Sequence, residues 1–327
     1  MGSPAQQLLD RFLIGYPRDG GFHHLKDCKI GILFDKPSPL LRQRKDDFGL
    51  IEFSNLGEAL ARADGIVVTW KGIGVEPKPG RLHQILEQAT PGARCFVHGN
   101  LAHTAAEATK LFEQTATSKI SLTSGTSMSG ALQLPELQKP ANGSIREFLI
   151  ITHGNRGEAE LDAVMGLLQF SDFKIATLKQ LQGHYVWKAA DAGEWSGKLV
   201  AAALSRSNTT QGGALRDGRT QDIYGLGLLP TLAKTPRAII MQGQSGIRAT
   251  ILILDGAIAD TTLAFSDETG AIFSTQLYRP PAPNREEFSR FAATIEDFFH
   301  SGTAFQSADQ SYFVADFFDR FRELRFR

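Results

Sequence analysis

Polar side chains that could transfer protons or bind a ligand gather in the stretch CFVHGNLAHT, residues 95–104. His98 and Asn100 follow a three-residue apolar run, and His103 precedes a helical pattern that starts near Thr104. An imidazole titrates close to neutral pH, so His98 could act as a general acid or base beside an amide, Asn100, that could bind a ligand. For His103, a structural role next to a helix N-terminus is the alternative.

Two more candidates stand outside this stretch. Lys71 follows an apolar run that ends in Trp70 and could reach a cleft, although most loop lysines face water. The segment HYVWK, residues 184–188, alternates in polarity as a strand does, so Trp187 could form a wall for a sugar ring or belong to the core. The serine-rich TSGTSMSG has no positioned base and no G-x-S-x-G elbow, which favours a polar junction over a nucleophile.

No stretch has the pattern of a phosphate-binding loop. A dinucleotide site requires a strand that opens into G-x-G-x-x-G at a helix N-terminus, because only glycine lets the backbone N–H groups approach the pyrophosphate. The first strand that the pattern supports, residues 29–34, ends in FDKPSP, and residues 1–28 contain no strand followed by a glycine loop. GIGVEPKPG and GLGLLP begin with G-x-G, but a proline or an unsuitable context follows in each.

The composition is that of a globular chain with no overall charge. The 327 residues suggest two domains, and 35 basic residues balance 35 acidic ones, so no field would attract nucleic acid or an anionic membrane. No signal peptide and no apolar run of roughly 18 residues is seen, so a cytoplasmic location is expected. Cys28 and Cys95 are expected as reduced core residues, and the neighbours His23 and His24 point to opposite sides of an extended chain, which predicts no metal site.

The elements that position these residues change character halfway along the chain. Short β-rich runs alternate with helical patterns in the first half, which predicts a parallel sheet covered by helices. The expected strands are 30–34, 66–69, 94–97 and 121–124, and the expected helices are 39–47, 57–63, 81–88 and 104–115. Residues 124–144 are rich in glycine, serine and proline, so we place one domain at 1–130 and another at 131–327.

Consecutive strands with turn sequences such as QSG and DETG predict a mostly antiparallel sheet in the second half, with helices on one face. The expected strands are 146–152, 173–178, 186–190, 238–242, 249–255, 261–266 and 272–278, and the expected helices are 158–168, 285–300 and 310–325. The fold class is therefore α/β plus α+β: a truncated Rossmann-like domain followed by an antiparallel-sheet domain. Such architectures usually bind a ligand between the two halves.

The order of these elements resembles the glucose-fructose oxidoreductase / inositol dehydrogenase (Gfo/Idh/MocA-like) family, whose members use NAD(P) on sugars and polyols. The resemblance covers about residues 11–302. RLHQILEQATPGARCFVHGNLAHT resembles the family's His-bearing helix and the strand that ends in Glu-Lys-Pro, which falls on His98, Gly99 and Asn100. The resemblance implies that Gly99 stands where the family has its proton-transferring lysine.

A second stretch, NRGEAELD, resembles the family pattern Asp-x-Gly-x-His-x-x-Asp. Gly157 and Asp162 match this pattern, while Asn155 and Ala159 stand in place of the first Asp and the His. The resemblance implies a catalytic role for Asp162 and ligand contacts for Asn155 and Arg156. It further implies a ligand contact for His83, and an adenosine ribose contact for Asp35 if NAD binds.

These substitutions lead to three hypotheses for function. The first is a degenerate homologue with a sugar-like cleft and no cofactor, which acts as a binding protein or partner subunit, or performs acid/base chemistry with His98, Asp162 or Lys71. The second is an NAD(P)-dependent sugar or polyol oxidoreductase with unconventional site residues. The third is a keto-sugar lyase, hydratase or isomerase. In each case we expect a homo-oligomer, most simply a dimer, because apolar strands such as ATILILDG could be covered by a second subunit.

Overall fold

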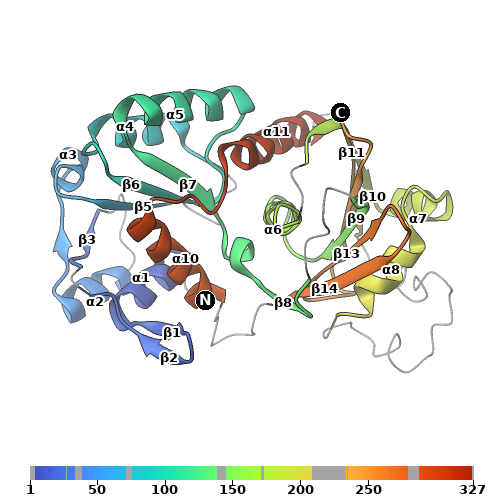
Figure 1. Cartoon of the computed structure of the whole chain (residues 1–327), viewed down its shortest axis with the longest axis horizontal. Coiled ribbons are helices and arrows are strands. Elements are labelled where there is room, and N and C mark those ends of the chain that lie inside the picture. The colour runs from blue at the N-terminus through green and yellow to red at the C-terminus, as the bar shows by residue number, and fades with distance from the viewer. Residues whose placement is uncertain are drawn as a thin grey trace. The chain divides into compact units, whose positions relative to one another are not determined.

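The chain passes from a first compact unit into a second and then returns to the first. The computed structural model describes residues 4–26, 28–33, 39–70, 76–137, 145–170, 173–207, 233, 235–278 and 287–325. Of these, residues up to 130 and residues 287–315 belong to the first unit, and residues 131–278 and 316–325 to the second (Figure 1). The sequence pattern placed residues 131–327 in the second domain, whereas in the structure residues 287–315 belong to the first unit.

The parallel strands of the first unit form two separate sheets. Strands β5 (Gly65–Thr69), β6 (Arg94–His98) and β7 (Ser121–Gly125) are parallel neighbours, with the last residue of each strand in register. Strands β3 (Gly31–Ile32) and β4 (Ile51–Glu52) make a parallel pair of their own. The helices between these strands are α2 (Pro39–Phe48), α3 (Leu56–Leu60), α4 (Pro79–Gln88) and α5 (Ala105–Ser118).

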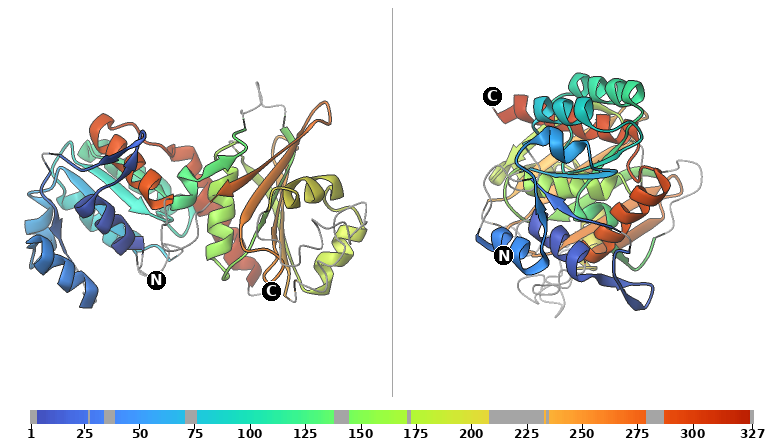
Figure 2. Two further views of the ribbon diagram at one scale, coloured as in Figure 1. Left: turned by 90° about the horizontal axis from the view of Figure 1, so that it is seen from below. Right: turned by 90° about the vertical axis from the view of Figure 1, so that its left-hand side faces the viewer.

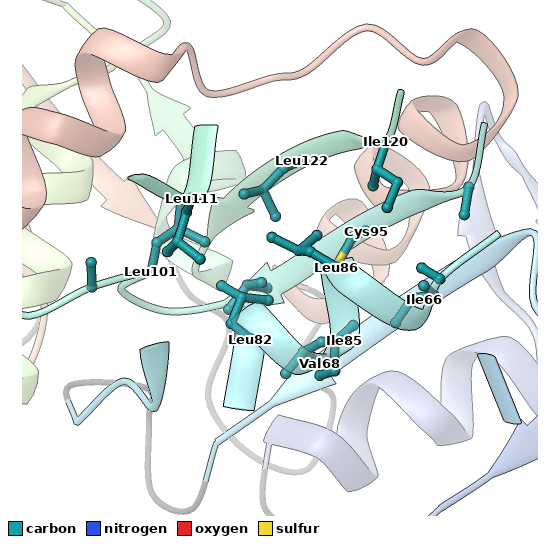
Figure 3. Close-up of a cluster of buried hydrophobic side chains, with 14 of the residues drawn as sticks. Ile66, Val68, Leu82, Ile85, Leu86, Cys95, Leu101, Leu111, Ile120 and Leu122 are labelled. Atoms are coloured by element: carbon teal, nitrogen blue, oxygen red, sulfur yellow. The ribbon is translucent and has the colours of Figure 1, made fainter. Parts of the chain in front are cut away.

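Successive residues of β6 point into two different cores, as the two-residue period of a strand requires. Cys95 and Val97 pack with apolar side chains of α4 and α5, among them Leu82, Leu86 and Leu111 (Figure 3). On the opposite face, Phe96 packs edge-to-face on Phe291 of α10 (Glu287–Ser301), with ring centroids 5.3 Å apart. The sheet is therefore covered on both faces within the first unit.

An N-terminal helix and hairpin complete the first unit. Helix α1 (Pro4–Ile14), which sequence analysis did not predict, precedes strands β1 (Tyr16–Arg18) and β2 (Gly21–His23). Asp19 and Gly20 join the two strands with φ of 52° and 78°, the left-handed conformation that Asp-Gly favours in a two-residue hairpin turn. Both α1 and β1 contact α10.

The second unit is built on one seven-stranded sheet. Its strand order is β10-β11-β12-β9-β13-β14-β8, and the pair of β12 with β9 is parallel while the other pairs are antiparallel. The strands are β8 (Leu132–Leu134), β9 (Ile145–Thr152), β10 (Ile175–Gln182), β11 (Arg237–Gly243), β12 (Arg248–Ile253), β13 (Thr261–Asp267) and β14 (Ile272–Tyr278). A short 3-10 helix, η1 (Ser127–Gly130), precedes β8, and α11 (Ala308–Arg325) ends the described chain.

Helices lie on both faces of this sheet, where the sequence pattern predicted helices on one face. Leu149 and Ile151 of β9 pack with α7 (His184–Asp191) and α8 (Gly197–Leu204). Ile150 points the other way and meets Gly166 of α6 (Glu158–Leu167). The left view of Figure 2 shows α6 on one side of the strands and α7 and α8 on the other. The face that we expected a second subunit to cover is therefore partly covered by the chain itself.

Two local expectations were also wrong. Residues 186–190 are helical, because Val186 and Ala189 lie three residues apart on the buried side of α7. Cys28 is exposed, whereas Cys95 is buried as expected, since the segment around Cys28 is not a buried strand in the structure. Among the residues that the structure describes, no helix has both the length and the apolar character needed to cross a membrane.

Candidate functional site

The carboxyl end of β6 carries the first group of predicted site residues. His98 is the last residue of the strand, and the N–H of Gly99 donates to the carbonyl oxygen of Gly125 at 2.8 Å. Gly99 has a φ of +97°, which strains any residue with a Cβ. The position that the family resemblance assigns to a lysine therefore has a backbone conformation suited to glycine.

His98 and Asn100 are buried rather than presented to solvent. Only 3% of His98 is exposed, and the centroid of its ring lies 6.0 Å from the centroid of the Phe291 ring on α10. Only 1% of Asn100 is exposed; its Oδ1 accepts from the N–H of Ala102 at 3.4 Å, and its Nδ2 has no hydrogen-bond partner among the described residues. A ligand would reach these groups only if the protein around them moved.

His103 lies at the N-terminus of α5, where side chains already bind the helix N–H groups. The N–H of Glu107 donates to Thr104 Oγ1 at 3.1 Å, and the N–H of His103 donates to Glu107 Oε2 at 2.8 Å. Thr104 is thus the N-cap of α5, and the Glu107 carboxylate binds the N–H of the residue before the cap. The carboxylate of Glu107 therefore stands where an anion bound to this helix terminus would have to sit.

The remaining candidates of the first unit do not join this group. His83 Nδ1 donates to Oε1 of Gln114, and Gln114 Nε2 donates back to the carbonyl oxygen of His83 at 3.0 Å, which ties α4 to α5. Lys71 and Asp35 lie outside the described residues. His98 and Asn100 thus lie at the carboxyl end of β6 and His103 just before α5, whereas His83 takes part in a contact between helices.

In the second unit, the loop from β9 to α6 exposes two predicted ligand-binding residues. Asn155 Nδ2 donates to Glu158 Oε2 at 3.4 Å. Arg156 Nη2 donates to Gln180 Oε1 of β10 at 3.1 Å, and its guanidinium lies over the ring of Phe321, 5.5 Å from the centroid. The aromatic ring and the amide hold the arginine in place and leave most of its five N–H donors for other partners.

Helix α6 carries Asp162 and the residue that replaces the family's histidine. Ala159 is 2% exposed and offers no group that could transfer a proton, whereas Asp162 is half-buried one turn further along. Asn155, Arg156 and Asp162 thus share one loop-and-helix segment. Trp187 does not belong with them, because it packs from α7 into the core on the opposite face of the sheet.

Sequence reasoning missed three charged residues around the same loop. Glu160 is fully buried, and its Oε2 accepts from the N–H of Gly157 at 2.5 Å. Arg237 Nη2 donates to the carbonyl oxygen of Gly154 at 2.9 Å, and Asp255 Oδ1 accepts from the N–H of Gly154 at 2.6 Å. The G-x-x-E spacing is a helix-start signal that could have identified Glu160. Arg237 begins β11 and Asp255 follows β12, both distant from the loop in sequence, so no local pattern indicates them.

The parallel strands of the first unit do not form one continuous sheet within the described residues. In a Rossmann sheet of order 3-2-1-4-5-6, the strand with the glycine loop lies between the second and the fourth strands. By their order along the chain, β3 would be the second strand of such a sheet and β5 the fourth. Within the described part of the chain, β3 pairs with β4 alone and β5 pairs with β6 alone. Within the described residues, no strand joins the β3–β4 pair to the sheet of β5, β6 and β7.

A metal centre finds no support either. Within the described ranges, no three His, Cys, Asp or Glu side chains are placed to share a metal ion. The side chains of both groups can form hydrogen bonds, and His98 and Asp162 carry groups of the kind that transfer protons.

The first unit is thus Rossmann-like, and the second is built on a seven-stranded, mostly antiparallel sheet. No protein-family profile matches the chain, and no curated protein matches it by sequence. Among solved structures, the chain is similar to apo scyllo-inositol dehydrogenase from Lactobacillus casei, with a TM-score of 0.60, 9% identity, and 99% of this chain and 93% of that chain covered.

Two further structures give the same result. One is a Gfo/Idh/MocA family oxidoreductase from Vibrio cholerae, with a TM-score of 0.58, 12% identity, and 99% and 96% of the two chains covered. The other is biliverdin reductase from Synechocystis in complex with biliverdin and NADP+, with a TM-score of 0.53, 12% identity, and 98% and 96% covered. The fold is that of the Gfo/Idh/MocA oxidoreductases.

Proposed function

We propose that this protein is a non-redox homologue of the Gfo/Idh/MocA oxidoreductases that binds a small carbohydrate-like molecule. The observation that carries the proposal is the interrupted parallel sheet, which lacks a strand between β3 and β5 within the described residues. Gly99 and Ala159 support it, because neither side chain can take the proton that leaves a hydroxyl group when hydride departs. Loss of one such group typically lowers the rate by about 10²- to 10⁴-fold.

We place the ligand at the loop from β9 to α6. Asn155 and Arg156 are exposed there and Asp162 is half-buried, so the segment offers an amide, a guanidinium and a carboxylate to hydroxyl groups. Structural neighbours are named for such compounds: scyllo-inositol for one dehydrogenase and UDP-N-acetylglucosamine for another. We propose a cytoplasmic protein, in keeping with the unpaired thiols of Cys28 and Cys95, and a dimer.

Titration with NADH and NADPH tests the absence of a cofactor. Nicotinamide fluorescence should stay unchanged up to millimolar protein, and micromolar binding of either nucleotide would refute the proposal. In parallel, calorimetry with myo-inositol, scyllo-inositol and glucose should show heat of binding for at least one compound. The variant Arg156→Ala should weaken that binding, while Arg146→Ala, which changes an exposed arginine of β9, should not.

The second candidate is an NAD(P)-dependent sugar or polyol oxidoreductase. The observation in its favour is that two structural neighbours contain the cofactor, biliverdin reductase with NADP+ and GenD2 from gentamicin A biosynthesis with NAD. This candidate predicts a change in absorbance at the nicotinamide band when the protein, NAD(P) and a polyol are mixed. The first candidate predicts none.

A further inference from the structure

The loop from β9 to α6 is bound by charged side chains on both of its glycines. Asp255 accepts from the N–H of Gly154, and Arg237 donates to the carbonyl oxygen of the same residue. At the other end of the loop, Glu160 accepts from the N–H of Gly157. Three backbone groups within four residues are therefore fixed by side chains rather than by a neighbouring strand.

Arg237 connects the two carboxylates. Its Nη1 lies 3.6 Å from Asp255 Oδ2 and its Nε lies 3.5 Å from Glu160 Oε1. The Glu160 side chain has no exposed surface, and 15% of the Arg237 side chain is exposed. Burial of a charge is costly unless a partner of opposite sign and hydrogen bonds compensate for it, so each of these charges depends on the others.

The glycines explain why the loop needs such support. Gly154 has a φ of +122° and Gly157 a φ of +94°, so the chain bends sharply at both positions. Glycine also has the greatest freedom in the absence of contacts, which means that nothing intrinsic to the sequence keeps the bends in place. The bends turn Asn155 and Arg156 outward, where both are exposed.

We propose that Arg237, held between Glu160 and Asp255, is a positioning residue that fixes the 153–157 loop in the conformation that presents Asn155 and Arg156 to the ligand. The ligand part of this inference rests on the proposed function. We call Glu160, Arg237 and Asp255 the clamp. Because these side chains bind backbone groups of the loop, their effect on the loop can be measured without any ligand. A rigid loop binds better than a mobile one because less freedom is lost on binding.

The test is the substitution Arg237→Lys, which keeps the positive charge and removes the planar group that reaches Gly154 and both carboxylates. Trypsin reports directly on the loop, because Arg156 is itself a cleavage site. Cleavage after Arg156, followed by mass spectrometry, should accelerate at least 10-fold in the variant. Hydrogen exchange at the amides of Gly154 and Gly157 should accelerate by a similar factor.

The matched control is Arg248→Lys. Arg248 Nη2 pairs with Glu147 Oε2 at 2.8 Å near the start of β12, on the same sheet and away from the loop. This control should leave cleavage after Arg156 unchanged. Asp255→Asn keeps the shape of the side chain and removes its charge, so its rate of cleavage after Arg156 should lie between those of the wild type and Arg237→Lys. This second variant still tests the clamp if Arg237→Lys fails to fold.

Two results would overturn the inference. One is unchanged cleavage and exchange at the loop in Arg237→Lys, and the other is an equal loss of protection throughout β9, β11 and β12, which would indicate a purely structural role. Binding of myo-inositol and scyllo-inositol separates this inference from the proposed function. If the wild-type protein binds neither compound, the proposed function loses support. The cleavage and exchange measurements still show whether Arg237 fixes the loop. If it binds one, the lysine variant should bind at least 5-fold more weakly, and equal affinity would contradict the positioning role.

Discussion

The carboxylate of Glu296 on α10 is the centre of the polar contacts that hold the N-terminal hairpin. It accepts a hydrogen bond from the hydroxyl of Tyr16 and from Nε2 of His23, which lies 2.9 Å from both carboxylate oxygens. Arg18 Nη1 lies 3.5 Å away on one side and His300 Nε2 lies 3.6 Å away on the other. Glu296→Gln should therefore loosen β1 and β2 from α10.

The size of the effect follows from burial and the number of donors. The Glu296 side chain is 8% exposed, and a hydrogen bond to a charged group contributes roughly 1.5–3 kcal/mol. Glutamine keeps one acceptor oxygen but directs an NH₂ group at donors, so at least one buried donor loses its partner. We expect a loss of about 2–4 kcal/mol in the free energy of unfolding.

The pH dependence gives an independent check. Burial acts to raise the pKa of Glu296, but hydrogen bonds from Tyr16 and His23 outweigh it and hold the pKa below the ordinary value. A carboxyl group with a lowered pKa stabilises the fold above its ordinary pKa, and this stabilisation disappears as pH falls through the lowered one. Burial and Glu296 also raise the pKa of the Tyr16 phenol, so this phenol should titrate well above the ordinary tyrosines.

Urea unfolding of wild type and Glu296→Gln, at pH 7 and at steps down to pH 3, measures the difference. The control is Asp297→Asn on the next residue, whose side chain is 61% exposed and pairs with Arg18 at 2.7 Å; exposed pairs contribute about 0–1 kcal/mol. The two proteins should converge in stability at the acid end. A loss below about 0.5 kcal/mol at pH 7, or a loss that stays constant down to pH 3, would refute the reasoning.

Two further outcomes follow from burial and packing. Ellman's reagent should modify Cys28 and spare Cys95 in the native protein, because Cys28 is exposed and Cys95 is buried; burial raises the pKa of both thiols, that of Cys95 to about 12, and rapid reaction of two thiols would contradict this. Gly125→Ala should cost about 1–3 kcal/mol in thermal unfolding, since a Cβ there would lie 2.6 Å from the ring of Phe305. Gly80→Ala in α4, where a Cβ meets nothing within 4 Å, should stabilise by about 0.5–1 kcal/mol, and the reverse order of the two variants would disprove the packing argument.

Local patterns predicted much of the first unit. The apolar run of residues 94–97 and the helical pattern that starts near Thr104 located β6 and α5 to within a few residues, because the strand and helix periods are properties of neighbouring residues. The prediction of a strand at residues 186–190 was wrong because the local pattern is ambiguous. A five-residue segment such as HYVWK fits both a two-residue and a 3.6-residue period, and only the packing of α7 on the sheet decides between them.

The polar centres could not be predicted in this way. Charged residues are rarely buried, so Glu160 on a helix and Arg237 at the start of a strand look solvent-exposed from sequence alone. Their charged partners come from segments distant in sequence, and the same is true of Glu296, whose contacts Tyr16, Arg18 and His23 lie near the N-terminus. The candidate site residues at 98–103 and 155–162 were located by resemblance and local spacing, and their burial emerged only from the structure.

The separation between His23 and Glu296, 273 residues, sets an order of events during synthesis of the chain. At typical translation speeds of about 5–20 residues per second, the hairpin is synthesised roughly 14–55 s before its anchoring helix. By then all seven strands of the large sheet have been made. Until α10 is synthesised, the N-terminal half is incomplete and leaves apolar surface uncovered. A fragment that stops before residue 287 should therefore need a chaperone or aggregate.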